Sequence, residues 1–363
     1  MSWLSLENPK DVPSPGLLLD PDRVQANINR MITMVGGPVH VDRLRPHLKT
    51  HKMARIVQMQ LAAGIRKFKA ATLAEAEMAA EAGAREVLVA YQLVGPRVDR
   101  MAAMLDRFSG TAFSTIVDDQ DAMQTIASKL GSPSRPIALY VDVDCGMGRT
   151  GVLFGEPLNR LRHAIESRAD VTFAGLHVYD GHLHDPSLDA RRREWEKNLR
   201  RIEQHVDAQG EAAVVGGGSP TFGLWAAHTS WECSPGTALL WDIDSRRTFR
   251  DLPFELAAAV ITRVISKPGE DRLCLDLGYK AIAAERPLED RVFFPELPEA
   301  EVILQNEEHL LLALPQASRY SVGDVLIGHP VHICPTVALY AEAFLVSQGK
   351  ASGECWRVTA RDR

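Results

Sequence analysis

The sequence predicts an α/β protein in which a (β/α)8 TIM-type barrel is followed by a C-terminal all-β domain. Up to residue 250, short apolar runs alternate with longer segments whose apolar residues recur at helical spacing. Eight such units with short connections favour parallel strands that close into a barrel. From Leu256 onward, strand-like runs follow one another with turn residues between them and no long helical pattern. The predicted barrel spans residues 13–250 and the β domain residues 251–363, which residues 1–12 could join.

Each barrel unit begins with a short apolar run that is typical of a buried strand. The first run ends at Asp20, which can cap a helix whose residues Val24 and Ile28 share one apolar face. Thr72 and Glu75 form a capping-box pattern at the start of the third helix. The expected strands cover residues 16–20, 44–49, 67–70, 86–90, 114–117, 137–143, 171–178, 212–215 and 231–234. The expected helices cover residues 21–35, 53–63, 72–82, 97–108, 119–130, 157–167 and 187–209, with a short helical stretch after residue 234.

The C-terminal region shows the period-two and turn signals of strands without helices between them. This pattern favours a small barrel or sandwich. The expected strands cover residues 260–266, 272–277, 301–304, 309–314, 325–327, 341–347 and 355–360.

Composition narrows the range of partners. The 363 residues are 45% hydrophobic and 24% charged with a net charge of −6, which is ordinary for a globular protein and gives no basic surplus for binding nucleic acid. No run of about 18 apolar residues predicts a membrane span, and residues 1–10 lack a secretory signal pattern. Five scattered cysteines favour a reducing cytoplasm over a disulfide framework.

The segment RPHLKTHK, residues 45–52, concentrates basic side chains at the end of a short predicted strand. Strand alternation would point His47 and Lys49 to one face. One interpretation is a solvated basic loop. The other is an amine nucleophile activated by neighbouring cations, of the kind that bonds covalently to carbonyl compounds such as pyridoxal phosphate (PLP).

Two glycine-rich turns follow later predicted strands. In DCGMGRTG, residues 144–151, Arg149 is either a surface cation or a planar donor for an oxyanion. In GGGSPT, residues 216–221, bare N–H groups and hydroxyls resemble a phosphate cradle, although the spacing is neither that of a Walker loop nor that of a dinucleotide fold. Ser234 to Thr237 could supply more donors, because barrel enzymes often bind phosphate after their last strands. The alternative is a turn that binds nothing.

The stretch that follows predicted strand 171–178 is rich in histidine. His177 and Tyr179 would share one face of the strand and point toward the barrel mouth. His182 and His184 could instead be solvated loop residues, and Asp185 could simply cap the next helix.

The pair His332 and Cys334 lies in a predicted extended segment of the β domain. Residues i and i+2 of an extended chain face the same side, so the imidazole and the thiolate could converge on one zinc ion. A cysteine packed in the core is the competing interpretation.

Taken together, six segments resemble the alanine-racemase-like (fold type III) PLP enzymes. The resemblance is to the branch that holds D-threonine aldolase, eukaryotic-type D-serine dehydratase and enzymes that cleave 3-hydroxyaspartate. The matching segments occur in the family's order and span nearly the whole chain: RPHLKTHK at 45–52, DCGMGRTG at 144–151, GGGS at 216–219, SKP at 266–268, LDLGYK at 275–280 and HICPT at 332–336.

The resemblance implies a role for each matching residue. Lys49 would hold PLP covalently, Arg149 would lie near its phenolic oxygen, and Tyr179 would line the ring or substrate pocket. His332 and Cys334 would bind a divalent metal; the cysteine form of this pair favours zinc, with manganese or magnesium as alternatives. It also implies a homodimer that acts on a small amino-acid substrate. The residues implied to hold the phosphate are Gly217, Gly218, Ser219, Gly236 and Thr237.

The implied activity is that of a PLP- and metal-dependent lyase acting on β-hydroxy-D-amino acids. The first expectation is D-threonine aldolase-like cleavage to glycine and an aldehyde, with His47, His182 or a metal-bound hydroxide as the candidate base. The alternative is a D-serine or 3-hydroxyaspartate dehydratase, which releases an oxo acid and ammonia. An amino-acid racemase or a non-catalytic PLP-binding protein are further alternatives; the racemase would need no metal, and non-catalytic carriers of this fold usually lack the β domain.

Overall fold

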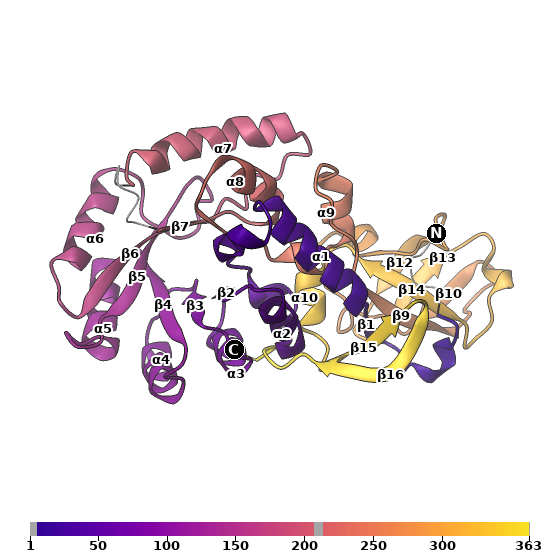
Figure 1. The fold of residues 1–363 in the computed structure, drawn as a ribbon. Coiled ribbons are helices and arrows are strands. Elements are labelled where there is room, and N and C mark those ends of the chain that lie inside the picture. Colours follow the sequence, from indigo (N-terminus) through magenta and orange to yellow (C-terminus); the bar gives the residue numbers. More distant parts are fainter. Residues whose placement is uncertain (1–5, 207–212, 363) are drawn as a thin grey trace.

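The computed structural model describes residues 6–206 and 213–362, which form two sheets flanked by helices (Figure 1). The first is a seven-stranded parallel sheet in the order β2 to β8. Its strands are β2 (Lys67–Ala70), β3 (Glu86–Val89), β4 (Ala112–Val117), β5 (Ile137–Val143), β6 (Val171–Val178), β7 (Ala213–Gly216) and β8 (Glu232–Cys233). Its helices are α2 (Ala54–Ala62), α3 (Leu73–Glu81), α4 (Pro96–Arg107), α5 (Gln120–Leu130), α6 (Glu156–Glu166), α7 (Leu188–Glu203) and α8 (Phe222–His228).

Residues 44–47 lie between the two edge strands of this sheet. Leu44 forms a parallel bridge with Cys233 of β8, and His47 forms one with Lys69 of β2. Arg45 N–H donates to the carbonyl of Cys233 at 2.9 Å, and Lys69 N–H donates to that of Pro46 at 2.9 Å. The segment therefore occupies the place of an eighth strand, and the predicted (β/α)8 barrel fold is confirmed. The predicted strand was too long, because Leu48–Thr50 turns into a 3-10 helix.

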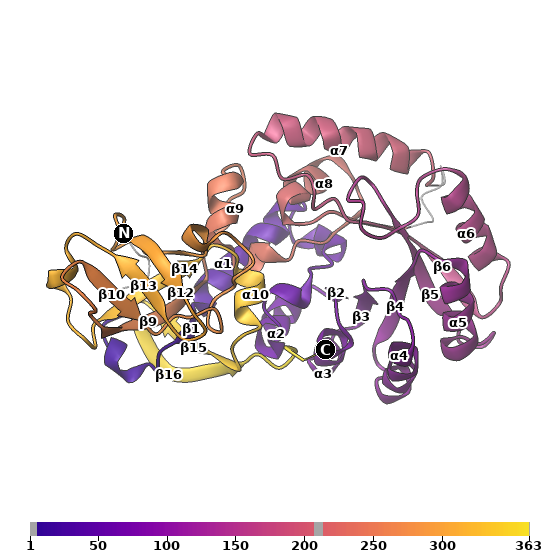
Figure 2. The same cartoon turned by 180° about the vertical axis from the view of Figure 1, so that it is seen from behind.

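The second sheet is mixed and contains strands from both ends of the chain (Figure 2). Strand β1 (Gly16–Leu19) pairs in parallel with β15 and antiparallel with β9. The expectation that residues 16–20 start the barrel is therefore wrong: β1 is apolar and buried on both faces, which suits a central strand of either sheet. The other strands are β9 (Ala258–Ser266), β10 (Arg272–Leu275), β11 (Val292–Phe293), β12 (Glu301–Gln305), β13 (Leu310–Ala313), β14 (Val325–Pro330), β15 (Glu342–Ser347) and β16 (Lys350–Arg357).

Helices α1 (Pro21–Met34) and α9 (Ile243–Thr248) connect the two sheets along the chain, and α10 (Ile333–Val337) lies between β14 and β15 of the second sheet. The predicted caps are present, since Asp20 accepts from Arg23 N–H at 3.1 Å and Thr72 accepts from Glu75 N–H at 3.2 Å. The predicted helix 187–209 ends at Glu203, and its last positions, 207–209, lie outside the described residues, as does position 212 of a predicted strand. Among the described residues, no helix has the length and apolarity that a membrane crossing requires.

Helix α10 corrects the prediction for the metal pair. Cys334 lies in this helix and His332 caps its start, so the segment is not extended. Helix α10 packs against the 3-10 turn that carries Lys49. This contact places part of the C-terminal domain at the mouth of the barrel.

Candidate active site

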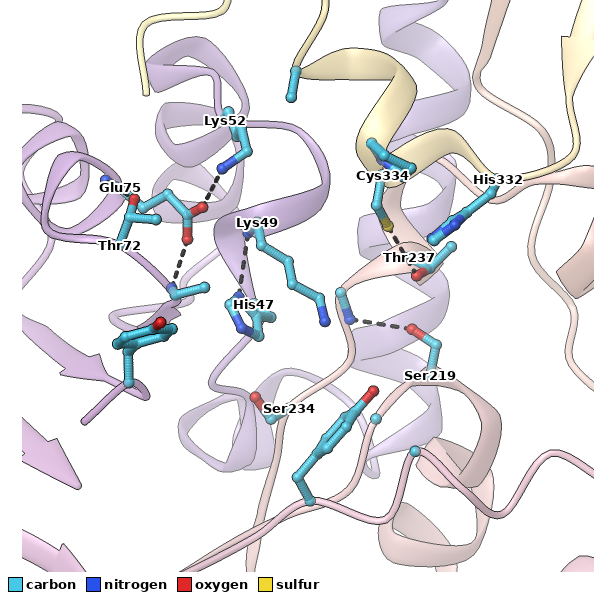
Figure 3. Close-up of a pocket in the computed structure, with 18 of the residues that line it drawn as sticks. His47, Lys49, Lys52, Thr72, Glu75, Ser219, Ser234, Thr237, His332 and Cys334 are labelled. Atoms are coloured by element: carbon cyan, nitrogen blue, oxygen red, sulfur yellow. Dashed lines mark hydrogen bonds and ion pairs between the residues drawn. The ribbon is translucent and has the colours of Figure 1, made fainter. Parts of the chain in front are cut away.

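A cavity of about 1460 Å³ opens where the barrel mouth meets the β domain (Figure 3). It contains side chains from the barrel and from α10, so both parts of the chain contribute to one site. Most of the residues that the sequence singled out line it: His47, Lys49, Tyr179, Gly218, Ser219, Gly236, Thr237, His332 and Cys334. Three others do not line it: Arg149, Gly217 and His182.

Lys49 extends from a short, rigid turn. The ring Nδ1 of His47 accepts from the backbone N–H of Lys49 at 3.2 Å, which caps the 3-10 turn and fixes the start of the lysine side chain. Burial lowers the pKa of His47 well below its usual value, and the charges of Lys49 and Lys69 lower it further. His47 is therefore neutral near pH 7 and uses Nδ1 as an acceptor.

The ring of Tyr179 is the centre of a cluster of cations. Lys49 Nζ lies 5.5 Å from the ring centroid, Lys69 Nζ 5.8 Å and Arg149 Cζ 5.2 Å. Such cations are attracted to the negative face of an aromatic ring. Arg149 thus reaches the site through Tyr179, although it does not line the cavity itself.

The loops after β7 and β8 form a hydroxyl- and amide-rich corner. Ser219 Oγ accepts from the backbone N–H of Gly236 at 3.1 Å and from that of Ala238 at 3.2 Å. These N–H groups converge from the second loop onto the first. Gly217 has φ of +74° and donates its N–H to the carbonyl of Val178 at 2.9 Å, so it shapes the turn from behind. A hydroxyl that accepts hydrogen bonds from two N–H groups, as Ser219 does, still has its own hydrogen to donate to an anionic oxygen.

His332 and Cys334 interact at the other side of the cavity. Burial opposes the charge on His332, but hydrogen bonds to Cys334 and Glu285 outweigh it and raise the pKa of His332 to about 9. The Nδ1 of His332 lies 2.6 Å from Glu285 Oε1, an arrangement that leaves Nε2 free to face the thiol. Cys334 Sγ lies 3.2 Å from Thr50 Oγ1 and 3.5 Å from Thr237 Oγ1.

This pair supplies two ligands of the types that zinc prefers, and a histidine fixed by a carboxylate is typical of metal sites. Within residues 6–206 and 213–362, no group of three or more His, Cys, Asp or Glu side chains is arranged to hold a metal ion. Water or substrate would have to complete the coordination.

His182 is not brought together with the other candidates. Its ring packs against the turn at Gly146, where an added Cβ would lie 2.9 Å from His182 Nε2. Its Nδ1 is buried and makes no hydrogen bond within the described part of the chain. His184 lines the cavity in its place, and the Asp185 carboxylate accepts from Ser187 N–H near the start of α7.

The sequence pattern singled out His177 but not Lys69 and Asp142, its partners in a buried polar row beneath Tyr179. Lys69 Nζ lies 3.4 Å from His177 Nε2, and His177 Nδ1 lies 2.7 Å from Asp142 Oδ1. Gln92 donates to the other oxygen of Asp142 at 2.9 Å. The signal was present in β2, where Lys69 lies between the apolar residues Phe68 and Ala70 of a short strand.

The sequence matches two family models. The model described as "Alanine racemase, N-terminal domain" matches residues 19–243, and the one described as "Putative serine dehydratase domain" matches residues 257–346. The first covers most of the chain. The second covers most of the region that follows the barrel.

Several proteins are similar over nearly their whole length. D-threonine aldolase of Arthrobacter sp is 29% identical over 360 residues, covering 96% of this chain and 93% of the relative. D-threo-3-hydroxyaspartate dehydratase of Delftia sp. (strain HT23) is 25% identical, covering 94% and 96%. The crystal structure of D-threonine aldolase from Filomicrobium marinum superposes with a TM-score of 0.88 at 26% identity, covering 99% and 98%.

Proposed function

We propose a function from one premise: this chain belongs to the family of the alanine racemase N-terminal domain, whose model matches residues 19–243. The chain acts as a PLP- and metal-dependent lyase that cleaves β-hydroxy-D-amino acids to glycine and an aldehyde. The observation that carries this proposal is that Lys49 of the barrel and the pair His332 and Cys334 of the β domain line one cavity. A D-threonine aldolase similar over 96% of the chain supports it.

The residues present fit PLP. Lys49 lines the cavity, and the hydroxyl of Ser219, which accepts from the N–H groups of Gly236 and Ala238, has its own hydrogen to donate to a phosphate there. Glycine at position 236 lets this loop pack directly on the turn that carries Lys49, because a Cβ there would lie 3.1 Å from the Cβ of His47. Lys49 would bind the aldehyde of PLP, which when bound withdraws electrons from the bonds of the substrate's Cα.

The chain's own residues supply orientation and metal ligands. His47 is buried and neutral, and because its Nδ1 accepts from the backbone N–H of Lys49, its Nε2 carries the ring hydrogen. The ring therefore orients Lys49 and can donate a hydrogen bond rather than accept a proton. His332 and Cys334 would hold a divalent metal, zinc by the softness of the thiolate, whose charge would favour ionisation of the β-hydroxyl. Cys334 of α10 and Ala338 at the end of this helix line the cavity together with Lys49.

A second candidate is a dehydratase that eliminates water from the same substrates. Two observations favour it: the match of residues 257–346 to the putative serine dehydratase domain, and the similarity to the Delftia dehydratase over 94% of the chain. Both reactions would use Lys49 and the metal pair, and they differ in which bond of the substrate breaks.

One experiment separates the candidates. The purified protein is supplied with PLP and Zn²⁺ or Mn²⁺ and incubated with D-threonine, D-serine or D-3-hydroxyaspartate, and the products are quantified. Glycine with an aldehyde supports cleavage of the carbon–carbon bond, whereas an oxo acid with ammonia supports elimination. Inversion of free alanine alone, unaffected by a chelator, would show a racemase and overturn both.

The cofactor assignment has its own control. Lys49→Ala should remove the visible absorbance that PLP gives on binding, while Lys129→Ala, an exposed lysine paired with Asp99 on the barrel surface, should retain it. A wild-type protein that stays colourless with PLP would contradict the proposal. We also expect a homodimer, which sedimentation can test.

A further inference from the structure

Asp180 is a buried carboxylate that the proposed reaction does not use. It directly follows Tyr179 at the end of β6 and is 1% exposed. A buried carboxylate is costly unless hydrogen bonds satisfy it. The role of Asp180 therefore depends on the hydrogen-bond donors that its two carboxylate oxygens bind.

Each oxygen of Asp180 accepts one hydrogen bond from the next unit of the barrel. Thr221 Oγ1 donates to Oδ1 at 2.8 Å, and Trp225 Nε1 donates to Oδ2 at 2.8 Å. Thr221 ends the short helix that begins at Ser219, and Trp225 lies in α8. The end of β6 is thereby tied to both sides of the turn that follows β7.

The ring of Trp225 packs against the backbone of that turn. A Cβ on Gly216 would overlap this ring, and a Cβ on Gly217 would lie 2.6 Å from its Cδ1 atom. The indole is also fixed from behind by Trp195, whose ring lies edge-on at 5.8 Å between centroids. The path of the glycine backbone is therefore set by where the Trp225 ring lies, and that ring is held by Asp180.

The same carboxylate sits beside the aromatic wall of the site. Tyr179, its chain neighbour, packs over the other end of the turn, where a Cβ on Gly218 would lie 3.1 Å from Tyr179 Cε2. Asp180 thus couples two parts of the proposed cofactor site, the ring of Tyr179 and the amide-rich corner at Ser219.

We propose that Asp180 is a positioning residue for phosphate binding, acting through Trp225 and Thr221 on the backbone of residues 216–219. The inference rests on the proposed cofactor site. A carboxylate is suited to this position because it accepts from two donors at once, whereas the amide of asparagine would turn an N–H₂ group toward one of them. Burial raises the pKa of Asp180, and the two hydrogen bonds oppose that rise.

The test compares three ligands: PLP, pyridoxal, which has the aldehyde but no phosphate, and inorganic phosphate. Asp180→Ala should weaken the binding of PLP and of inorganic phosphate about tenfold or more, because Trp225 and Thr221 would lose the acceptor that fixes them against the backbone of residues 216–219. The affinity for pyridoxal should change by less than about threefold. Thr221→Val, which removes one donor and keeps the side-chain shape, should weaken the same two ligands by a smaller factor. This variant keeps the inference testable if Asp180→Ala fails to fold.

Asp251→Asn is the matched control. Asp251 pairs with the buried Arg191 at 2.6 Å on the outside of the barrel and does not line the cavity, so this variant should lower thermal stability without changing the affinity for PLP. Equal losses of PLP and pyridoxal in the Asp180 and Thr221 variants, or no loss at all, would overturn the inference. A wild-type protein that binds phosphate but not PLP would overturn the proposed function alone, and one that binds neither would overturn both.

Discussion

The side chains of Lys69 and His177 lie 3.4 Å apart between Nζ and Nε2 in the closed interior of the barrel. His177 is in turn held by Asp142, at 2.7 Å from Nδ1 to Oδ1. Burial lowers the pKa of His177, as does the charge of Lys69. When His177 is neutral and donates its Nδ1–H to Asp142, its Nε2 accepts a hydrogen bond from Lys69. Each hydrogen bond of the row then points from the amine of Lys69 toward the carboxylate of Asp142.

The pH dependence of stability should reveal Lys69. Burial, reinforced by the charge of Lys49, lowers the pKa of Lys69 to about 7 from 10.5. Between these values the unfolded chain binds the extra proton, so this group destabilises the fold fully below pH 7 and progressively less as the pH rises toward 10.5. Lys69→Met should therefore raise the free energy of unfolding of the cofactor-free protein by an amount on the order of a few kcal/mol at pH 7.

Urea titrations at pH 7 and pH 10 would measure this effect, with Lys129→Met as the surface control. A stabilisation of the same size at both pH values would show that Lys69 is charged throughout and would contradict the prediction.

Acid stability should depend on His51. This ring is fully buried, its Nδ1 accepts from Met53 N–H at 3.1 Å, and burial lowers its pKa to about 3 from 6.5. The unfolded chain gains a proton below pH 6.5 that the folded chain takes up only near pH 3, so stability falls as the pH falls through this window. His51→Asn should retain the acceptor and, at pH 5, remove about 2 kcal/mol of this acid-induced loss.

The measurement is the difference in unfolding free energy between pH 7 and pH 5 for the wild type and the variant. His40→Asn, in an exposed segment, provides the comparison. Identical acid profiles for the wild type and His51→Asn would rule out a buried neutral imidazole.

Arg45 and Glu232 form a buried ion pair where residues 44–47 close the barrel. Arg45 Nε lies 2.5 Å from Glu232 Oε2, and the arginine side chain is 2% exposed. Lys67 Nζ also lies 2.6 Å from Glu232 Oε1, so Arg45→Met leaves this carboxylate with one cation and should lower the free energy of unfolding by about 1–3 kcal/mol, the cost of losing a buried hydrogen bond to a charged group. Lys129→Met, which breaks an exposed pair with Asp99, should change it by less than about 1 kcal/mol. Chemical denaturation of the three proteins measures both effects, and similar losses in the two variants would refute the distinction.

The amount and the kind of metal bound should depend on the side chain at position 334. Cys334→Ala should lower bound zinc and turnover together, because it removes one of two protein ligands. Cys334→Asp should shift the preferred ion from zinc toward manganese, since a carboxylate is a harder ligand than a thiolate. Elemental analysis after dialysis, paired with activity at fixed metal, measures both, and Cys355→Ala on the exposed β16 is the control. Turnover that persists in a metal-free Cys334→Ala protein would disprove the metal assignment.

Much of the barrel could be predicted because its strands and helices carry strong local signals. The caps at Asp20 and Thr72, and the glycine turns after β5 and β7, are determined by nearby residues. The placement of β1 could not be predicted, because an apolar four-residue strand has no feature that distinguishes one buried sheet from another.

The residues of the candidate site likewise include some that the sequence predicts and some that it does not. Lys49 and the turn at Ser219 follow strand ends, where barrel topology places them together. The pairing of His332 with Cys334 was predicted from extended geometry, whereas the chain turns helical at Ile333. Lys69 and Asp180 were missed because their importance depends on contacts with residues far along the chain, and spacing carries no information on such contacts.

The pairing of β1 (Gly16–Leu19) with a strand near the other end of the chain affects how the protein folds during synthesis. The partner segment, Ala343 to Leu345, leaves the ribosome more than 300 residues later, which at about 5–20 residues per second is a delay of roughly 15 to 65 s. Until β9 is synthesised the apolar strand has neither of its neighbours, and afterwards its β15 side stays unpaired until the end of the chain is made. A fragment released before residue 343 would expose that edge, so incomplete chains of this protein should aggregate while finished ones do not.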